Sequence, residues 1–158
     1  MAKKSMKKIP LPADTVSEIL NASPDATIIS DARGIIRVAN LAAETLFGYA
    51  AGELIGQPVE VLVPEASRAR HRDMRNSFHK APRGRPMVSG LEIHGLHRDG
   101  QTFRVEVGLN PIETDDGLLV TSTIRPAKTA EDSEAYFRNL LESAPDAMII
   151  IDEKGKIA

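Results

Sequence analysis

The sequence contains no cysteine and no tryptophan among its 158 residues, and only four phenylalanines and two tyrosines. The absence of cysteine excludes disulfides, thiolate zinc sites, cysteine-ligated iron–sulfur clusters, cysteine nucleophiles and photochemistry through a cysteine adduct. No apolar run approaches the ~18 residues of a membrane-spanning helix, so the sequence predicts no membrane segment. An excess of either charge is also lacking, because 20 Lys and Arg against 22 Asp and Glu leave a formal charge of -2. This balance argues against a whole-chain nucleic-acid binder.

The hydrophobic fraction, 42%, is that of an ordinary globular protein, and we expect the chain to bury a core. The first residues carry Lys3, Lys4, Lys7 and Lys8, followed by the sequence Ile9-Pro10-Leu11-Pro12. A secretory signal needs an apolar stretch after its basic residues, and none follows here. We therefore expect residues 1–14 to form a flexible basic leader and the protein to be cytoplasmic.

A repeat divides the rest of the chain. Residues 20–37 and 141–158 align with nine identities in eighteen positions at a constant offset of 121, where chance gives about one. A repeat of this length indicates tandem copies of a whole small domain. We expect the first domain at 15–126, a linker or signalling helix at 127–142, and the truncated start of a second domain at 143–158.

Local patterns predict the secondary structure of the first copy. Helical spacing or capping signals predict helices, and short β-branched or alternating runs between turn residues predict strands. The two strongest hairpin signals are Arg98-Asp99-Gly100 and Asp115-Asp116-Gly117. The expected helices cover 15–22, 41–47 (with Asn40 as the N-cap), 51–55 and 64–80, and the expected strands cover 26–30, 35–39, 88–96, 102–109 and 118–124.

This order of elements predicts an α+β fold with a five-stranded antiparallel sheet and the helices on one face, enclosing a core or pocket. The sequence over positions 19–125 resembles the PAS sensor domains. The resemblance implies that a second PAS domain begins near Tyr136. The motifs that carry the resemblance are Ser23-Pro24-Asp25-Ala26, Asp31 with Gly34, Asn40, Phe47-Gly48-Tyr49, Glu53-Leu54-Ile55-Gly56, Val63-Pro64-Glu65 and Arg98-Asp99-Gly100.

The resemblance implies the strand order 2-1-5-4-3 and an internal cavity between sheet and helices. It also implies a role in sensing signals or in dimerisation within a larger protein, such as a histidine kinase of a two-component system, a diguanylate cyclase or a transcriptional regulator. The output domain of such a protein is not in this chain.

A small-molecule pocket is predicted between the sheet and the helices, with plain core packing as the alternative for each residue. A small organic ligand, for example a carboxylate held by His71 or a nearby arginine, would occupy it. The candidate pocket residues are Leu46, Phe47, Ile55, Leu62, His71, Met74, Phe78, Leu91, Ile93, Phe103, Val105, Val120 and Ser122.

Haem is one cofactor that the resemblance allows. In the haem-binding branch of the family the proximal histidine lies on the helix that holds Arg70-His71-Arg72-Asp73-Met74, so His71 is a candidate ligand of haem iron. The sequence departs from that branch at Leu91, where some oxygen sensors have an arginine. The alternative for His71 is a hydrogen-bonded, half-buried structural histidine. A cysteine-adduct flavin is excluded, and non-covalent flavin is disfavoured.

Three further clusters do not predict a site. His94 and His97 lie three apart on an expected strand and face opposite sides, so they cannot chelate one metal. The seven Lys and Arg of residues 65–85 favour a solvated helix face over nucleic-acid contact. Asp115 and Asp116 are ordinary turn residues. With no nucleophile elbow or phosphate-binding loop, the sequence predicts no enzyme activity.

The chain after the first domain has the pattern of a transmitting helix. The apolar residues Tyr136, Phe137, Leu140 and Leu141 recur at helical spacing among acidic residues, which suits pairing with a second copy. We expect a homodimer through the N-terminal and linker helices, in which a ligand or redox change biases two packings. One feature departs from the family, because Arg125-Pro126-Ala127-Lys128 stands where an exit motif containing aspartate is common. A ligand-free dimerisation domain is the alternative.

Overall fold

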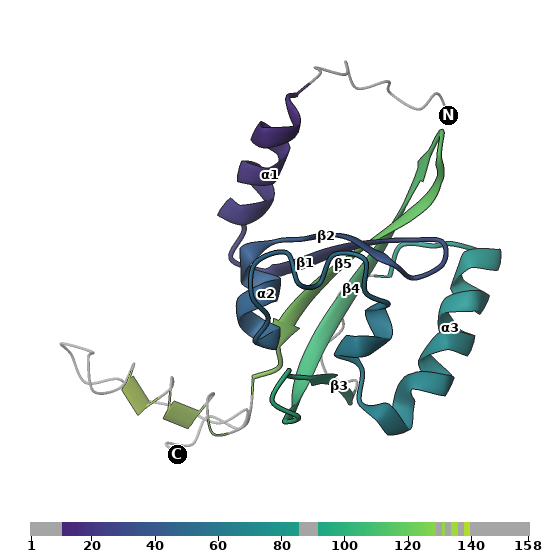
Figure 1. Cartoon of the computed structure of the whole chain (residues 1–158). Helices are drawn as coiled ribbons and strands as arrows, with labels where there is room; N and C mark the ends of the chain where they lie inside the picture. The colour runs from purple at the N-terminus through teal and green to yellow at the C-terminus, as the bar shows by residue number, and fades with distance from the viewer. Residues whose placement is uncertain (1–10, 86–91, 129–130, 132–133, 136–137, 140–158) are drawn as a thin grey trace, which may run out of the picture. The chain divides into compact units, whose positions relative to one another are not determined.

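The computed structural model describes residues 11–85 and 92–128, together with residues 131, 134, 135, 138 and 139. The chain divides into two compact units, Met1–Pro126 and Ala127–Ala158, and every element named below lies in the first (Figure 1). In chain order the elements are α1 (Ala13–Ala22), β1 (Ala26–Asp31), β2 (Ile36–Ala39), α2 (Leu41–Phe47), the 3₁₀ helices η1 (Val59–Leu62) and η2 (Glu65–Ser67), α3 (Arg68–Lys80), β3 (Ile93–Leu96), β4 (Thr102–Thr114) and β5 (Gly117–Pro126).

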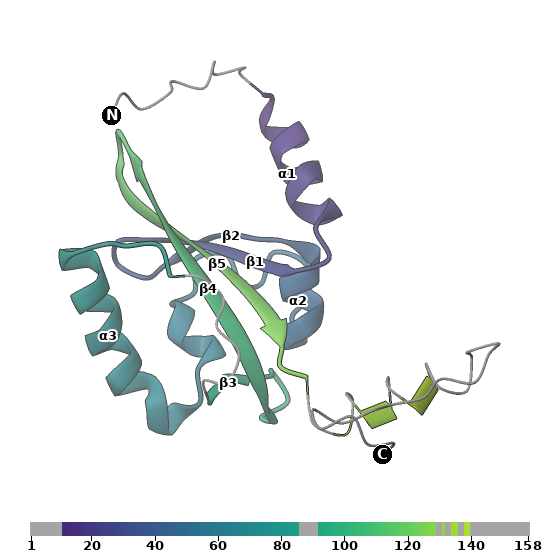
Figure 2. The ribbon, with the colours of Figure 1, turned by 180° about the vertical axis from the view of Figure 1, so that it is seen from behind.

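The five strands form one antiparallel sheet in the order β2-β1-β5-β4-β3, which confirms the predicted order. Helices α2 and α3 lie on the same face of this sheet, and the view from behind shows the opposite face in front of them (Figures 1 and 2). The register places Ala26 of β1 opposite Ile124 of β5, and Ile124 opposite Val107 of β4. Because side chains alternate along a strand, the side chains of these three residues, and of every second residue along each strand from them, face the helices.

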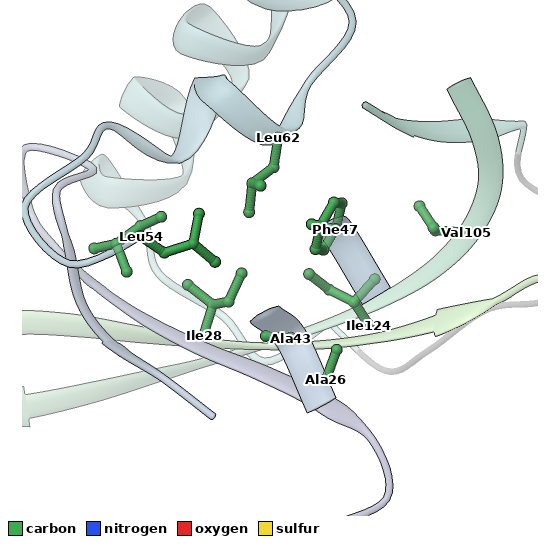
Figure 3. Close-up of a cluster of buried hydrophobic side chains, with 9 residues drawn as sticks. Ala26, Ile28, Ala43, Phe47, Leu54, Leu62, Val105 and Ile124 are labelled. Carbon is green, nitrogen blue, oxygen red and sulfur yellow. The ribbon is translucent and has the colours of Figure 1, made fainter. Parts of the chain in front are cut away.

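The core lies between the sheet and the helices that cover it (Figure 3). The rings of Phe47 from α2 and Phe103 from β4 pack with centroids 5.5 Å apart. Full burial of each large aliphatic or aromatic side chain stabilises the fold by about 1.5–3 kcal/mol. The buried hydrophobic cluster consists of Ala26, Ile28, Ile36, Ala43, Phe47, Leu54, Leu62, Val105 and Ile124.

Asn40 begins α2 as the sequence predicts, and it also joins three other segments. Its Oδ1 accepts hydrogen bonds from the amides of Ala43 (3.0 Å) and Thr27 (2.8 Å). Its Nδ2 donates to the carbonyls of Leu20 and Asp25, each at 2.9 Å. The side chain is only 1% exposed and fully paired, so one buried amide fixes α1, the start of β1 and the first turn of α2 together.

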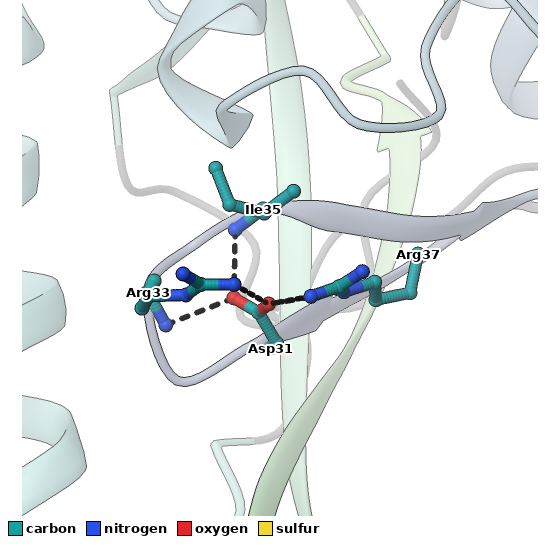
Figure 4. A network of polar contacts seen from close by, with 4 residues as sticks. All are labelled: Asp31, Arg33, Ile35 and Arg37. Atoms are coloured by element: carbon teal, nitrogen blue, oxygen red, sulfur yellow. Dashed lines mark hydrogen bonds and ion pairs between the residues drawn. The ribbon is translucent and has the colours of Figure 1, made fainter.

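The turn between β1 and β2 is held by Asp31 (Figure 4). Its Oδ1 accepts from the amides of Arg33 (2.9 Å) and Ile35 (3.0 Å), and its Oδ2 accepts from Arg37 at 2.7 Å. Burial raises the pKa of the Asp31 carboxyl, but these hydrogen bonds outweigh it and leave the pKa below its ordinary value. Gly34 completes the turn at φ 78°, a conformation that favours glycine.

Two strands extend further than the sequence predicts. Pairing between β4 and β5 continues to Thr114 and Gly117, so the hairpin closes tightly around Asp115-Asp116. The expected strands 102–109 and 118–124 were therefore too short, because the hydrophobic alternation ends before the backbone pairing does. The expected strand 88–96 is β3 at Ile93–Leu96, and residues 88–91 lie outside or at the border of the described part, which resumes at Glu92.

Two helical predictions also change. Residues 51–55 form turns rather than the expected helical turn, since Gly52 and Gly56 adopt φ 79° and 83°. The helix expected from residue 64 begins with the separate 3₁₀ helix η2, and α3 proper starts at Arg68. No helix among residues 11–85 and the other described parts is long and apolar enough to span a bilayer.

Candidate functional site

A polar cluster lies where α3 packs against η1. Glu60 of η1 is only 6% exposed, yet it carries a carboxylate. His71 Nδ1 lies 3.1 Å and Arg75 Nε 3.0 Å from the same oxygen, Glu60 Oε1. Because His71 and Arg75 are four residues apart, one face of α3 presents both nitrogens to this acid.

The cluster keeps Glu60 ionised. Burial raises the pKa of the Glu60 carboxyl, but the hydrogen bond to His71 and the charge of Arg75 outweigh it, so the pKa lies below its ordinary range. A carboxylate can only accept hydrogen bonds, so its contact requires a proton on His71 Nδ1. The nitrogen that remains, Nε2, is then free to accept a hydrogen bond or to bind a metal in the neutral ring.

Arg75 also connects α3 to the β1–β2 turn. A Cβ added at Gly34 would meet the Arg75 guanidinium at 2.6 Å, so the arginine lies directly against this glycine. The Gly34 carbonyl in turn accepts from the Val59 amide at 2.8 Å, one residue before Glu60. The cluster therefore joins α3, η1 and the β1–β2 turn at the edge of the sheet.

His71 satisfies one requirement of a haem ligand. Histidine ligands of metals commonly donate their second nitrogen to a carboxylate, which fixes the tautomer and orients the ring. Glu60 occupies that place at Nδ1, so His71 would hold haem iron through its other nitrogen, Nε2. No three His, Cys, Asp or Glu side chains gather as a metal site in the described parts of the chain.

The predicted pocket residues differ in their burial. Phe47, Leu62, Val105, Val120 and Ser122 are buried. Leu46, His71, Phe78, Ile93 and Phe103 are half-buried, and Phe103, Ile93 and Leu46 pack against the core. Leu91 lies outside the described residues.

The remaining two, Ile55 and Met74, are 47% and 49% exposed, so they lie at the surface and outside the buried core. Leu54, the neighbour of Ile55, is the fully buried residue of that segment. On α3 the ion pair with Glu60 turns Arg75 inward, and the adjacent Met74 consequently points to solvent. Helical spacing alone does not show whether Met74 or Arg75 faces inward.

Glu60 and Arg75 were missed by the sequence analysis. Hydrophobic periodicity scores charged residues as exposed, and Glu60 precedes Arg75 by fifteen positions across two 3₁₀ turns. The only available signal was the pair of basic residues His71 and Arg75 at i and i+4 on one helix. This spacing does not show which acidic side chain of another element pairs with the two basic residues.

A second feature is a groove of about 430 Å³ at the end of the sheet, next to the last turn of α1 and the first turns of α2. Its lining includes Pro24, Leu41, Leu46 and Pro126. Asp25 and Arg125 form its polar part, with Arg125 Nε 2.8 Å from Asp25 Oδ1 and Arg125 Nη2 2.7 Å from Oδ2. Leu46 is a predicted pocket residue that lines this groove. Another hollow, of about 530 Å³, lies between the β1–β2 and β4–β5 turns.

Of the clusters that the sequence analysis set aside, the basic segment 65–85 is not wholly solvated, because Arg75 turns inward to Glu60. The other two clusters lie at or near the surface. His97 packs its ring against Gly48, and His97 Nδ1 lies 2.9 Å from Asp99 Oδ1, while His94 is exposed. Asp115 and Asp116 are exposed in the β4–β5 turn. The signalling-helix residues Tyr136, Phe137, Leu140 and Leu141 lie outside the described residues.

Two families match the sequence. The family described as PAS fold matches residues 15–127, and another described as PAS domain matches residues 135–157, which confirms the recognition of a domain and the start of a second. Among curated proteins, the chain is 31% identical over 122 residues to sensor protein FixL of Bradyrhizobium diazoefficiens. The match covers 77% of this chain but only 24% of FixL, so the chain spans about a quarter of that relative.

Solved structures show the same fold. The PAS domain of a Colwellia psychrerythraea protein has 25% identity and a TM-score of 0.60, covering 72% of this chain and 94% of that one. The PAS domain of nitrogen regulation protein NR(II) from Vibrio parahaemolyticus has 24% identity and a TM-score of 0.54, covering 70% and 96%. These similarities agree with the predicted α+β architecture.

Proposed function

Because this chain belongs to the PAS family, we propose that its first domain is the sensory module of a larger signal-transduction protein. The module binds a small ligand or cofactor beside α3 and relays the change through its flanking helices in a cytoplasmic homodimer. It has no catalytic role of its own, and the output domain, of the histidine kinase, diguanylate cyclase or transcriptional regulator class, lies outside this chain. Nucleic acid and membrane are not its partners.

The observation that carries the proposal is the buried Glu60 cluster. Buried charges are costly unless they are paired, and charged side chains are seldom fully buried without a partner. Here the pair joins Glu60 of η1 to Arg75 of α3, and Arg75 also lies against Gly34 in the β1–β2 turn. A ligand that competes for His71 or Arg75 would therefore displace α3 relative to the sheet, which is the kind of change a sensor has to transmit.

The ligand chemistry follows from the same side chains. His71 is half-exposed, at 36% of its side chain, and Arg75 is less exposed, at 16%. A small carboxylate can take hydrogen bonds from both groups in place of Glu60, because an arginine and a histidine form charge-assisted bonds to such anions. Ligand binding at this position is accordingly sensitive to His71 and insensitive to the exposed His94.

The test combines native mass spectrometry with a thermal-shift screen of small carboxylates on the freshly purified chain. We expect either a co-purifying small molecule or a stabilising carboxylate whose effect is lost in His71→Ala and kept in the control His94→Ala. A ligand whose binding is the same in both variants would contradict the assigned site. No bound molecule and no stabilising compound would instead favour the ligand-free dimerisation module.

Haem is the second candidate, favoured by the contact of His71 Nδ1 with Glu60. His71 would bind the iron through Nε2, and Glu60 would hold the ring in the tautomer that presents this nitrogen. When bound, haem iron supplies the binding of a diatomic gas or one-electron exchange. A Soret band after expression with a haem precursor, lost in His71→Ala and retained in His94→Ala, is the expected result. Haem-free protein under these conditions would contradict this candidate.

A further inference from the structure

An ion pair connects the two ends of the first domain. The β1–β5 register pairs Ala26 with Ile124, so the next position outward places Asp25 opposite Arg125. The two side chains make a two-pronged contact of 2.8 and 2.7 Å, although they are 100 residues apart in sequence. On the other side of Arg125, the β4–β5 register places Glu106 opposite it. Arg125 of β5 is therefore the single cation in a row of three charged side chains, between Asp25, which directly precedes β1, and Glu106 of β4.

Asp25 is bound in turn to the helix that precedes it. Asn40 Nδ2 donates to the main-chain carbonyls of both Asp25 and Leu20, and Leu20 belongs to the last turn of α1. Asn21 Oδ1 accepts from the amide of Leu41, which gives α1 a second attachment to α2. A continuous set of contacts thus runs from α1 through Asn40 and Asp25 to Arg125 at the end of β5.

We propose that the Asp25–Arg125 ion pair couples the incoming helix α1 to the chain that leaves β5, so that a displacement at one end of the domain reaches the other. The inference rests on the proposed sensory function for its purpose, but the coupling itself is a property of this domain. Pro126 follows directly and ends the strand, so Arg125 is the last residue of β5 that can fix the departing chain through a side-chain ion pair with β1.

This ion pair lies where the sequence departs from the family, because Arg125-Pro126-Ala127-Lys128 stands in place of the expected exit motif that contains aspartate. The resemblance places an aspartate after the last strand, whereas here the base lies on that strand and the acid lies before β1. Asp25 is 24% and Arg125 55% exposed, so water and salt reach the pair. The coupling is consequently adjustable rather than rigid, because an exposed pair contributes little to overall stability.

Hydrogen exchange of the 158-residue chain, followed by mass spectrometry, tests the proposal. In Arg125→Gln we expect exchange to become about two- to five-fold faster in the last turn of α1, the range that loss of an exposed ion pair supports. Asp25→Asn should have the same effect. The matched control is Glu106→Gln, which removes the other neighbour of Arg125 and should leave α1 unchanged.

A double-mutant cycle decides between coupling and local damage. If the pair acts as a unit, Asp25→Asn combined with Arg125→Gln exchanges no faster in α1 than either single variant. The charge-reversed pair, Asp25→Arg with Arg125→Asp, should restore protection of α1. Additive effects, or changes confined to the end of β5, would overturn the proposal.

The experiment is separate from the test of sensing. It is carried out without added ligand, so its failure shows that the two ends are uncoupled, whatever the domain binds. Failure of the mass-spectrometric and thermal-shift tests shows that no ligand acts at His71, and leaves the exchange result unaffected.

Discussion

At the residue scale, the small side chain of Asn40 joins several segments of the domain. Four hydrogen bonds converge on it, two accepted and two donated, and Asn40 itself is only 1% exposed. Buried groups that lose such a partner keep their desolvation penalty without compensation. The side chain is therefore a structural requirement for the α1–β1–α2 junction as well as an N-cap.

We expect Asn40→Ala to lower the free energy of unfolding by about 3 kcal/mol, because it removes a helix cap and leaves buried donors and acceptors unpaired. Urea unfolding of the two proteins measures the difference. Asn40→Asp is the control, since its oxygens still cap α2 while the donors to Leu20 and Asp25 are lost, and its effect should be intermediate. A loss below 1 kcal/mol in the alanine variant would show that water replaces these bonds.

Glu60 gives the domain an acid-dependent contribution to stability. Although burial raises the pKa of this carboxyl, the bond to His71 and the charge of Arg75 lower it more, so the folded pKa lies below the unfolded value of about 4.3. A depressed carboxyl pKa stabilises the fold above the unfolded pKa, and the contribution disappears as the pH falls through the folded pKa.

The expected result is that Glu60→Gln is less stable than the wild type at pH 7, by about 2 kcal/mol, and that the difference narrows below about pH 4. Unfolding midpoints measured from pH 7 to pH 3 test this. Glu65→Gln, an exposed acid on η2, is the matched control and should show no such convergence. A difference that stays constant with pH would contradict the assignment of Glu60 as the titrating group.

At the scale of elements, β3 and α2 meet closely because β3 contains a glycine. A Cβ added at Gly95 would lie 2.9 Å from a ring carbon of Phe47 and 3.3 Å from one of Phe103. Both rings belong to the best-packed part of the core, so neither can move away freely. The absence of a side chain at this position allows the edge strand to close over the α2 aromatic residue.

Gly95→Ala should therefore destabilise the domain by about 1–3 kcal/mol through overpacking. Thermal or urea unfolding measures this loss, and His94→Ala on the same strand provides the control because His94 is exposed. If the glycine variant were as stable as the control, Phe47 would have to adopt another rotamer, and a near-ultraviolet spectrum would detect that change.

The sheet was predictable from sequence because its turns carry strong local signals. Gly34, Gly100 and Gly117 all adopt positive φ at the predicted hairpins, and the alternation of Phe103 and Val105 identified the inner face. The surface of α3 was less predictable. Met74 and Arg75 lie about 100° apart on the helix, and a contact with Glu60, which no periodicity reports, decides which of them faces inward.

At the scale of the whole molecule, α1 has an apolar side without a partner in the described part of the chain. None of its residues is buried, and Val16 and Ile19 are among the exposed large hydrophobic residues. Their spacing of three places both on one side of the helix. Such a side is suited to pairing with a second copy, in line with the dimer that we propose.

We expect the double substitution Val16→Glu and Ile19→Glu to weaken self-association at least ten-fold, because a charged face cannot be buried against its like. Sedimentation velocity over a range of concentrations measures this. Ser17→Glu, on the same helix but away from the apolar side, should associate as the wild type does. If the double variant associates normally, the dimer contact lies elsewhere.

The register that places Asp25 opposite Arg125 has a consequence for the architecture of longer proteins. These two positions are 100 residues apart in sequence, and the chain between them returns to the place where it started. A folded unit whose two ends lie side by side can be inserted between two neighbouring segments of another chain without separating them. The domain is thus suited to insertion into, duplication within or removal from a longer polypeptide. The repeat in the sequence, at its constant offset of 121 residues, has the form that such a duplication leaves.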